Sequence, residues 1–168
     1  MFKRFTKPTC LYLAILMLLC VFSVSIFAYA EGYDTYYAND PVVNKFINEY
    51  NDAYEEDITD IEQGNIRTKY FGNLKGTYLE MINANDAYAE AFTVKINCSE
   101  NHDILFQVFG EMARILEPSL TDEALQEGIH ALSETGYMVE NLQVGNTLTV
   151  TFVPSGRIDI GASDYKGD

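Results

Sequence analysis

Residues 91–116 read AFTVKINCSENHDILFQVFGEMARIL, and the two halves of this stretch have different periods. In FTVKIN (92–97), apolar and polar side chains alternate, which predicts a strand with one buried face. From residue 102 to residue 116, apolar side chains recur every three or four positions and Pro118 follows, which predicts an amphipathic helix that ends there. These two elements must bury their apolar surfaces against a partner, so the stretch predicts a helix packed on a sheet.

Two further strands are predicted upstream. Residues 66–71 and 77–83 are strand-like and are separated by GNLKG, and a loop leads from the second of them to a strand over 91–97. Short connections between consecutive strands predict antiparallel pairing. The preceding segment, residues 55–65, is acidic and ends at Gly64-Asn65, so it is predicted to be a solvated turn.

The C-terminal part of the chain carries a hairpin signal. Residues 137–144 and 147–153 flank Gly145-Asn146, a two-residue connection of the kind that favours a tight hairpin turn. Residues 157–160 are expected to add a short edge strand after this hairpin. The sheet is therefore predicted to have five or six strands.

Capping residues mark two more helices. Asp40 precedes Pro41, which is favoured at the first helical position, and apolar residues recur at helical spacing over residues 41–54. Thr121 followed by two acidic residues predicts the start of a third helix, which would end at Gly136. The predicted order is α-β-β-β-α-α-β-β(-β). The fold class is predicted to be α+β, with an antiparallel sheet and three helices packed on one of its faces.

The N-terminal 30 residues have the three parts of a secretory signal peptide. Lys3, Arg4 and Lys7 precede an almost wholly apolar run over residues 11–27, and Ala28-Tyr29-Ala30 supplies small residues at a cleavage site. An uncleaved membrane anchor is the alternative interpretation. After the leader we expect a flexible acidic tether over residues 31–40, a single α+β domain over residues 41–160 and a loose C-terminal tail over residues 161–168.

Charge and cysteine content limit the compartment and the partners. Cleavage after Ala30 would remove three of the 11 basic residues and none of the 25 acidic ones, taking the net charge from −14 to −17. A chain this acidic is not expected to bind nucleic acid, and it would meet a membrane only through the signal segment. Cys98 would be the sole remaining cysteine, expected as a small structural side chain, so no internal disulfide could form. We predict a secreted or cell-envelope-associated protein.

Residues that could carry catalysis are few. His102 and His130 lack a nucleophile or metal ligand at a known motif spacing, and no phosphate-binding or dinucleotide-binding glycine pattern occurs. Six carboxylates fall within eleven residues, but their spacing does not match a calcium-binding loop. They are Asp52, Glu55, Glu56, Asp57, Asp60 and Glu62. We therefore predict no catalytic residue, no metal site and no cofactor.

The strands indicate one surface suited to contact. If Phe92 and its apolar neighbours point inward, the outward side chains are hydroxyl-rich, include a tyrosine and are locally basic. Tyrosine and arginine are favoured in protein contacts, although threonine, tyrosine and lysine also suit any wet strand surface. Thr147, Thr149 and Thr151 are expected on this polar side too. The candidate binding residues are Arg67, Lys69, Tyr78, Thr93, Lys95 and Thr149.

The stretch DIEQGNIRTKYF at residues 60–71 resembles small exported α+β proteins of Gram-positive bacteria that have no assigned activity. The resemblance implies compartment and fold, and it assigns no functional residue. The sequence favours an exported binding module that contacts an unidentified extracytoplasmic protein or polymer through the outer sheet face. The alternatives are an extracytoplasmic hydrolase that uses carboxylates or His130, and a structural envelope protein.

Overall fold

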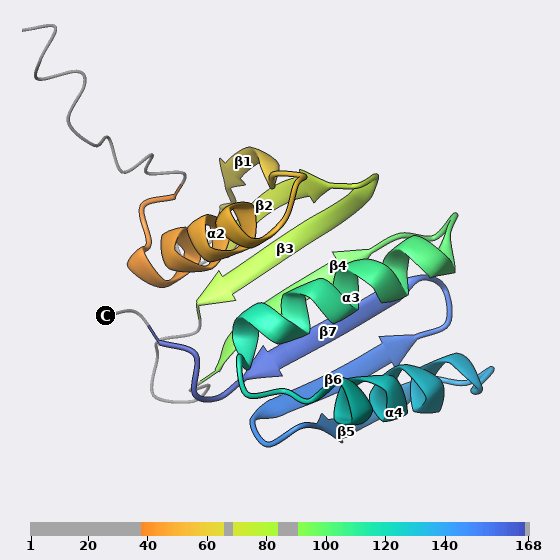
Figure 1. The fold of residues 1–168 in the computed structure, drawn as a ribbon. Helices are drawn as coiled ribbons and strands as arrows, with labels where there is room; N and C mark the ends of the chain where they lie inside the picture. The colour runs from red at the N-terminus through yellow and green to blue at the C-terminus, as the bar shows by residue number, and fades with distance from the viewer. Residues whose placement is uncertain (1–37, 66–68, 84–90, 167–168) are drawn as a thin grey trace, which may run out of the picture. The chain divides into compact units, whose positions relative to one another are not determined.

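The computed structural model describes residues 38–65, 69–83 and 91–166 (Figure 1). Within these ranges the chain forms three helices and seven strands. In chain order they are α2 (Pro41–Ala53), β1 (Thr59–Gln63), β2 (Lys69–Leu74), β3 (Thr77–Asn83), β4 (Phe92–Asn97), α3 (His102–Leu116), α4 (Asp122–Ser133), β5 (Val139–Val144), β6 (Leu148–Val153) and β7 (Arg157–Ala162).

All seven strands belong to one antiparallel sheet, in the spatial order β1-β2-β3-β4-β7-β6-β5. The predicted α+β class is confirmed. The predicted strand number is wrong, because the sheet has seven strands rather than five or six. The unpredicted strand is β1 at the edge of the sheet, and β7, which was expected at an edge, lies inside it.

The edge strand β1 comes from the segment that was predicted to be an acidic turn. Four of its five residues are exposed, so it lacks the alternation that identifies a half-buried strand. It pairs with β2, and Ile58 just before it is buried. Gly72 of β2 allows this approach, because a Cβ there would lie 3.0 Å from the Ile58 side chain. The strand is thus held by one neighbour rather than by an apolar face of its own.

Strand β7 was predicted as an edge strand, but it lies inside the sheet. It pairs with β4 on one side and with β6 on the other, so it joins the N-terminal meander to the C-terminal hairpin. Ile158 and Ile160 point to the helix side and are wholly buried. A position inside the sheet requires both edges of the strand to pair, and the sequence of this short segment does not reveal that.

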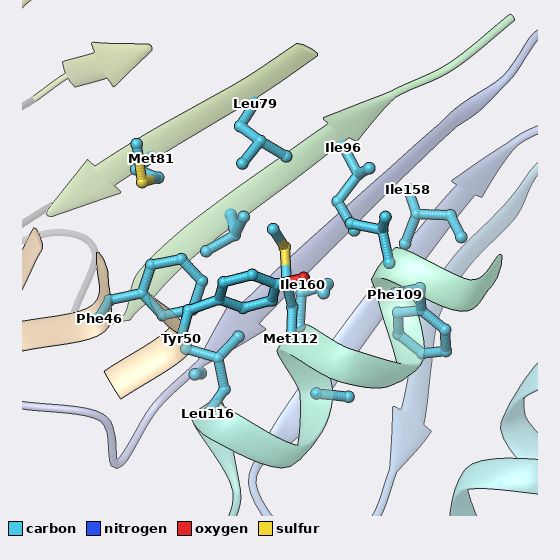
Figure 2. Packing of buried hydrophobic residues seen from close by; sticks show 14 of the residues in the cluster. Phe46, Tyr50, Leu79, Met81, Ile96, Phe109, Met112, Leu116, Ile158 and Ile160 are labelled. Atoms are coloured by element: carbon cyan, nitrogen blue, oxygen red, sulfur yellow. The ribbon is translucent and has the colours of Figure 1, made fainter. Parts of the chain in front are cut away.

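The three helices cover one face of the sheet, as predicted (Figure 1). Asp40 caps α2 by accepting hydrogen bonds from the Val42 and Val43 amides, and Thr121 caps α4 through the Ala124 amide. Figure 2 shows side chains of α2 and α3 meeting the inward side chains of the central strands. The predicted inward residues of the meander are all buried; they are Leu79, Met81, Phe92, Val94 and Ile96.

Both edges of the sheet are interrupted by a bulge. The β1–β2 register shifts between Thr59 and Glu62, and the β5–β6 register shifts between Val139 and Leu142. A residue with left-handed backbone lies inside each shift: Asp60 at φ 53° and Asn141 at φ 56°. Bulges twist an edge strand and break its row of free backbone groups, so neither edge offers a long, regular template for another strand.

Both predicted termini of the domain are extended by ordered contacts. At the N-terminal side, Ala38 is buried and pairs with the Asn44 side chain, so residues 38–40 of the expected tether are fixed. At the C-terminal side, β7 reaches Ala162, and the Tyr165 hydroxyl donates to the Glu49 carboxylate at 2.5 Å. The structure therefore anchors most of the expected loose tail.

No helix within residues 38–65, 69–83 and 91–166 is long and apolar enough to cross a bilayer. The predicted signal peptide and residues 31–37 of the predicted tether lie outside the described residues.

Candidate functional site

The candidate binding residues share the sheet face that no helix covers. Lys69, Thr93 and Thr149 lie on one row of paired residues that crosses the sheet from β2 to β6, and Lys95 and Tyr78 lie on the next two rows. We call the outward side chains of these rows the outer face. Arg67 lies outside the described residues.

The cations of the outer face are matched by acids. Lys69 forms an ion pair with Glu80, and Lys95 Nζ lies 3.6 Å from Glu80 Oε1 on the facing strand. Arg157 Nε lies 3.0 Å from Asp159 Oδ1. The locally basic character predicted for this face is therefore offset by Glu80 and Asp159 among the described residues. The sequence does not reveal the pairing, because the register of β2, β3, β4 and β7 decides which acid meets which base.

Asp159 occupies the middle of this charge network. Burial raises its pKa above the ordinary aspartate value, and the Glu80 carboxylate adds to the rise, while Arg157 and Lys95 oppose it. Its Oδ1 and the Arg157 Nε make an ion pair without hydrogen-bond geometry. The network therefore places Asp159 among two cations and a second carboxylate on a partly desolvated surface.

Next to these charges lies a stack of three side chains. The Lys69 ammonium lies 5.8 Å from the Phe71 ring centroid, and the Phe71 and Tyr78 rings stack with centroids 5.5 Å apart. Tyr78 ends the stack and is 46 % exposed. An aromatic side chain that is already held in place loses little entropy when it contacts a partner, so Tyr78 is a preorganised contact residue.

A glycine sits between two of the candidate threonines. Gly161 of β7 pairs with Thr93 on one side and with Thr149 on the other. A Cβ at this position would meet only the Thr149 carbonyl oxygen, at 3.7 Å. The outer face is therefore lowered at its centre, a feature that was missed because Gly161 was assigned to the tail.

A second polar cluster ties the helix layer to a turn. Lys75 Nζ lies 2.6 Å from Glu111 Oε1, and Tyr50 donates to Glu111 Oε2 at 2.5 Å. Burial opposes ionisation of Glu111, but hydrogen bonds from Lys75, Tyr50 and Gln107 outweigh it and lower the pKa. Burial and the bond to Glu111 raise the pKa of Tyr50. These groups satisfy one another, so the cluster holds the turn in place.

The ion pair explains why Lys75 tolerates its backbone conformation. Lys75 and Gly76 form the β2–β3 turn with φ 50° and φ 76°, and a left-handed conformation is unfavourable for lysine. We expect Lys75→Met to lower the free energy of unfolding by about 1–3 kcal/mol, because it leaves a partly buried carboxylate without its cation. Urea denaturation measures this change. The double variant Lys75→Met/Glu111→Met should recover part of the loss, and a single variant as stable as wild type would contradict the assignment.

Two pockets among the described residues lie on the helix side of the sheet. One of about 560 Å³ is lined by α4, by the β5–β6 turn and by Glu117 at the end of α3. Glu117 is buried and accepts hydrogen bonds from the Thr147 amide and hydroxyl, each at 2.8 Å. Burial opposes its ionisation, but these bonds and those from Asn146 lower its pKa. Thr147 thus serves this turn rather than the outer face, and Glu117 is structural.

The residues considered for catalysis are dispersed. His130 is 75 % exposed, with Nδ1 3.8 Å from Glu134 Oε1, and His102 lies edge-on to Phe152. Cys98 is buried with Sγ 3.3 Å from the Asn101 carbonyl oxygen. All six acids of the 52–62 run are exposed. Within the described ranges, no three His, Cys, Asp or Glu side chains gather closely enough to hold a metal ion.

No known family model matches the chain, and neither the curated proteins nor the solved structures include a significant match. Function must therefore be inferred from the geometry of the outer face itself.

Proposed function

We propose that the protein is an exported binding module that contacts an extracytoplasmic protein or polymer through the outer face of its sheet. The observation that carries this proposal is the Lys69–Phe71–Tyr78 stack, which places a held tyrosine ring on a surface left open by all three helices. Tyrosine is enriched among the residues that contribute most to binding.

The surroundings of Tyr78 support a contact role. Asn73 and Asn97 are its register partners on the two neighbouring strands, so residues with polar side chains occupy the positions on both sides of it. The charges nearby are paired across the strands, so polar groups surround the ring. An aromatic centre with polar surroundings is the usual composition of a binding surface.

Replacing the exposed ring tests this proposal. We expect the purified protein to bind cell-envelope material of the producing organism saturably in a co-sedimentation assay. The Tyr78→Ser variant should bind about tenfold more weakly, as expected for the loss of a central aromatic contact. Because Tyr78 is 46 % exposed, the melting temperature should change little.

Tyr137→Ser is the matched control. Tyr137 is 83 % exposed and precedes β5, away from the stack, so its replacement should leave binding unchanged. Equal binding by wild type and Tyr78→Ser, or an equal loss in both variants, would remove the outer face from consideration.

A further inference from the structure

The ion pair between Asp159 and Arg157 lies on the outer face and lacks good geometry. Asp159 Oδ1 and Arg157 Nε are both buried, and although they lie 3.0 Å apart, neither makes a hydrogen bond within the described residues. The Asp159 side chain is 21 % exposed. A buried carboxylate oxygen that accepts no hydrogen bond favours the neutral acid over the anion. This geometry therefore favours proton uptake by Asp159.

The strands on either side of Asp159 do not supply the missing partner. Its register partners are Lys95 on β4 and the uncharged Thr151 on β6. Lys95 is shared with a second carboxylate, because Glu80 pairs with it from β3 and its Nζ lies 3.6 Å from Glu80 Oε1. In the described part of the chain, Arg157 is thus the one cation within ion-pair distance of Asp159.

The charges of the cluster act on Asp159 in opposite directions. Burial is the main cause that raises the pKa of Asp159, and the Glu80 carboxylate adds to the rise. Arg157 and Lys95 lower the pKa but do not outweigh burial. Lys69, on β2, is engaged by Glu80 instead. The direction of the pKa shift therefore agrees with the geometry of the ion pair.

Arg157 shares a row of the outer face with the exposed tyrosine. Asn97 of β4 pairs with Tyr78 on one side and with Arg157 on the other. Two strand spacings, about 10 Å, separate Tyr78 from Arg157. The Arg157 side chain is 43 % exposed, so it has room to turn towards solvent. A guanidinium group donates several strong hydrogen bonds, so Arg157 can contact a partner that covers Tyr78.

We infer that the Asp159–Arg157 ion pair makes the outer face sensitive to acid: a proton taken up by Asp159 releases Arg157 to contact a partner beside Tyr78. The proton comes from solvent and neutralises the Asp159 carboxylate. The cluster of Lys69, Glu80, Lys95, Arg157 and Asp159 then changes from three cations with two carboxylates to three cations with one. This inference rests on the proposed function and adds regulation of the same surface.

NMR signals of the two side chains test the release directly. In the wild-type protein, the Arg157 Nε signal should shift with the same midpoint pH as the Asp159 side-chain carboxyl signal. This midpoint should lie above that of exposed aspartates, because Asp159 is partly buried. An Arg157 signal that does not follow the protonation of Asp159 would overturn the inference.

The Asp159→Asn variant distinguishes a pH-sensitive pair from a stabilising ion pair. The folded state holds the Asp159 proton more tightly than the unfolded chain, so stability falls as the pH rises from the ordinary aspartate pKa of 3.8 through the raised value. Asparagine resembles the neutral acid, so the melting temperature of the variant at neutral pH should equal or exceed that of wild type. A stabilising ion pair would instead give a lower melting temperature, which would contradict the inference.

Co-sedimentation with envelope material at neutral pH and at about pH 5 measures the effect on binding. We expect wild type to bind about threefold more tightly at the lower pH, as expected for one added positive charge near the contact. Asp159→Asn should bind at neutral pH as wild type binds at the lower pH. Glu123→Gln is the matched control, because it removes one exposed carboxylate from α4 on the helix side and should bind like wild type at both pH values.

The inference is overturned if wild type binds equally at the two pH values, or if Asp159→Asn keeps the full pH dependence. If envelope binding still depends on Tyr78 in either case, the proposed function stands and only its regulation by acid fails. Absence of saturable binding by the wild-type protein would overturn both.

Discussion

Glu117→Ala is expected to lower the free energy of unfolding by about 3–5 kcal/mol, measured by urea denaturation. Glu117 is only 3 % exposed, and its carboxylate accepts hydrogen bonds from the Asn146 amide and from the Thr147 amide and hydroxyl. Removing the carboxylate leaves these partly buried donors unpaired, which costs about 1–3 kcal/mol for each group. The Glu117 carboxylate packs closely against the backbone of Gly145, because an added Cβ at Gly145 would lie 2.8 Å from Glu117 Oε1.

The same carboxylate should make stability depend on acid pH. Its pKa is lowered in the folded protein, so the unfolded state binds the proton more readily. The stabilisation is therefore complete above the ordinary glutamate pKa of 4.5 and is lost as the pH falls through the lowered value. Glu117→Gln removes this acid dependence while keeping the shape. An alanine variant within about 1 kcal/mol of wild type, or an unchanged acid slope in the glutamine variant, would contradict the role assigned to Glu117.

Gly156→Ala is expected to be destabilising to a similar degree. Gly156 lies in the β6–β7 turn at φ 101°, and a Cβ there would lie 2.4 Å from the Cys98 carbonyl oxygen and 2.5 Å from Ser99 Cα. Left-handed strain of about 1–3 kcal/mol adds to a backbone clash of about 1–3 kcal/mol. The clash also opposes the hydrogen bond from the Cys98 amide to the Gly156 carbonyl, which continues the β4–β7 pairing.

The melting temperatures of Gly156→Ala and Gly136→Ala, measured by thermal unfolding, separate the clash at Gly156 from the general effect of replacing a glycine by alanine. Gly136 is exposed with open space around it, so its alanine variant should stay within about 0.5 kcal/mol of wild type. Similar melting temperatures for the two variants would show that the β6–β7 turn can rearrange, and would contradict the expected clash.

Elements with a strong period were predictable from the sequence. The helix over 102–116 agrees in both bounds, and the alternation of FTVKIN identified a strand whose apolar residues are buried. These segments contact the core along most of their length. Their apolar residues therefore recur at the spacing of the buried face, every second residue in the strand and every three or four residues in the helix. The caps Asp40 and Thr121 were recognisable because their chemistry is local to each helix start.

Features that depend on neighbours distant in sequence were not predictable. Strand β1 has no apolar face, and its pairing is decided by β2. The outer face was recognised as a surface, but not its charge balance, because Glu80 meets Lys69 and Lys95 only through the register of three strands. The position of Gly161 between Thr93 and Thr149 was not predictable either, because it depends on β7 lying between β4 and β6.

The central place of β7 also bears on how the chain reaches its folded state. It is the last strand in chain order among the described elements, yet β4 and β6 meet only through it. The meander and the hairpin therefore cannot join through the sheet until residues 157–162 have been synthesised. Long-range pairing of this kind slows folding. We therefore expect the meander and the hairpin to associate late in folding, once the C-terminal strand can pair with both of them.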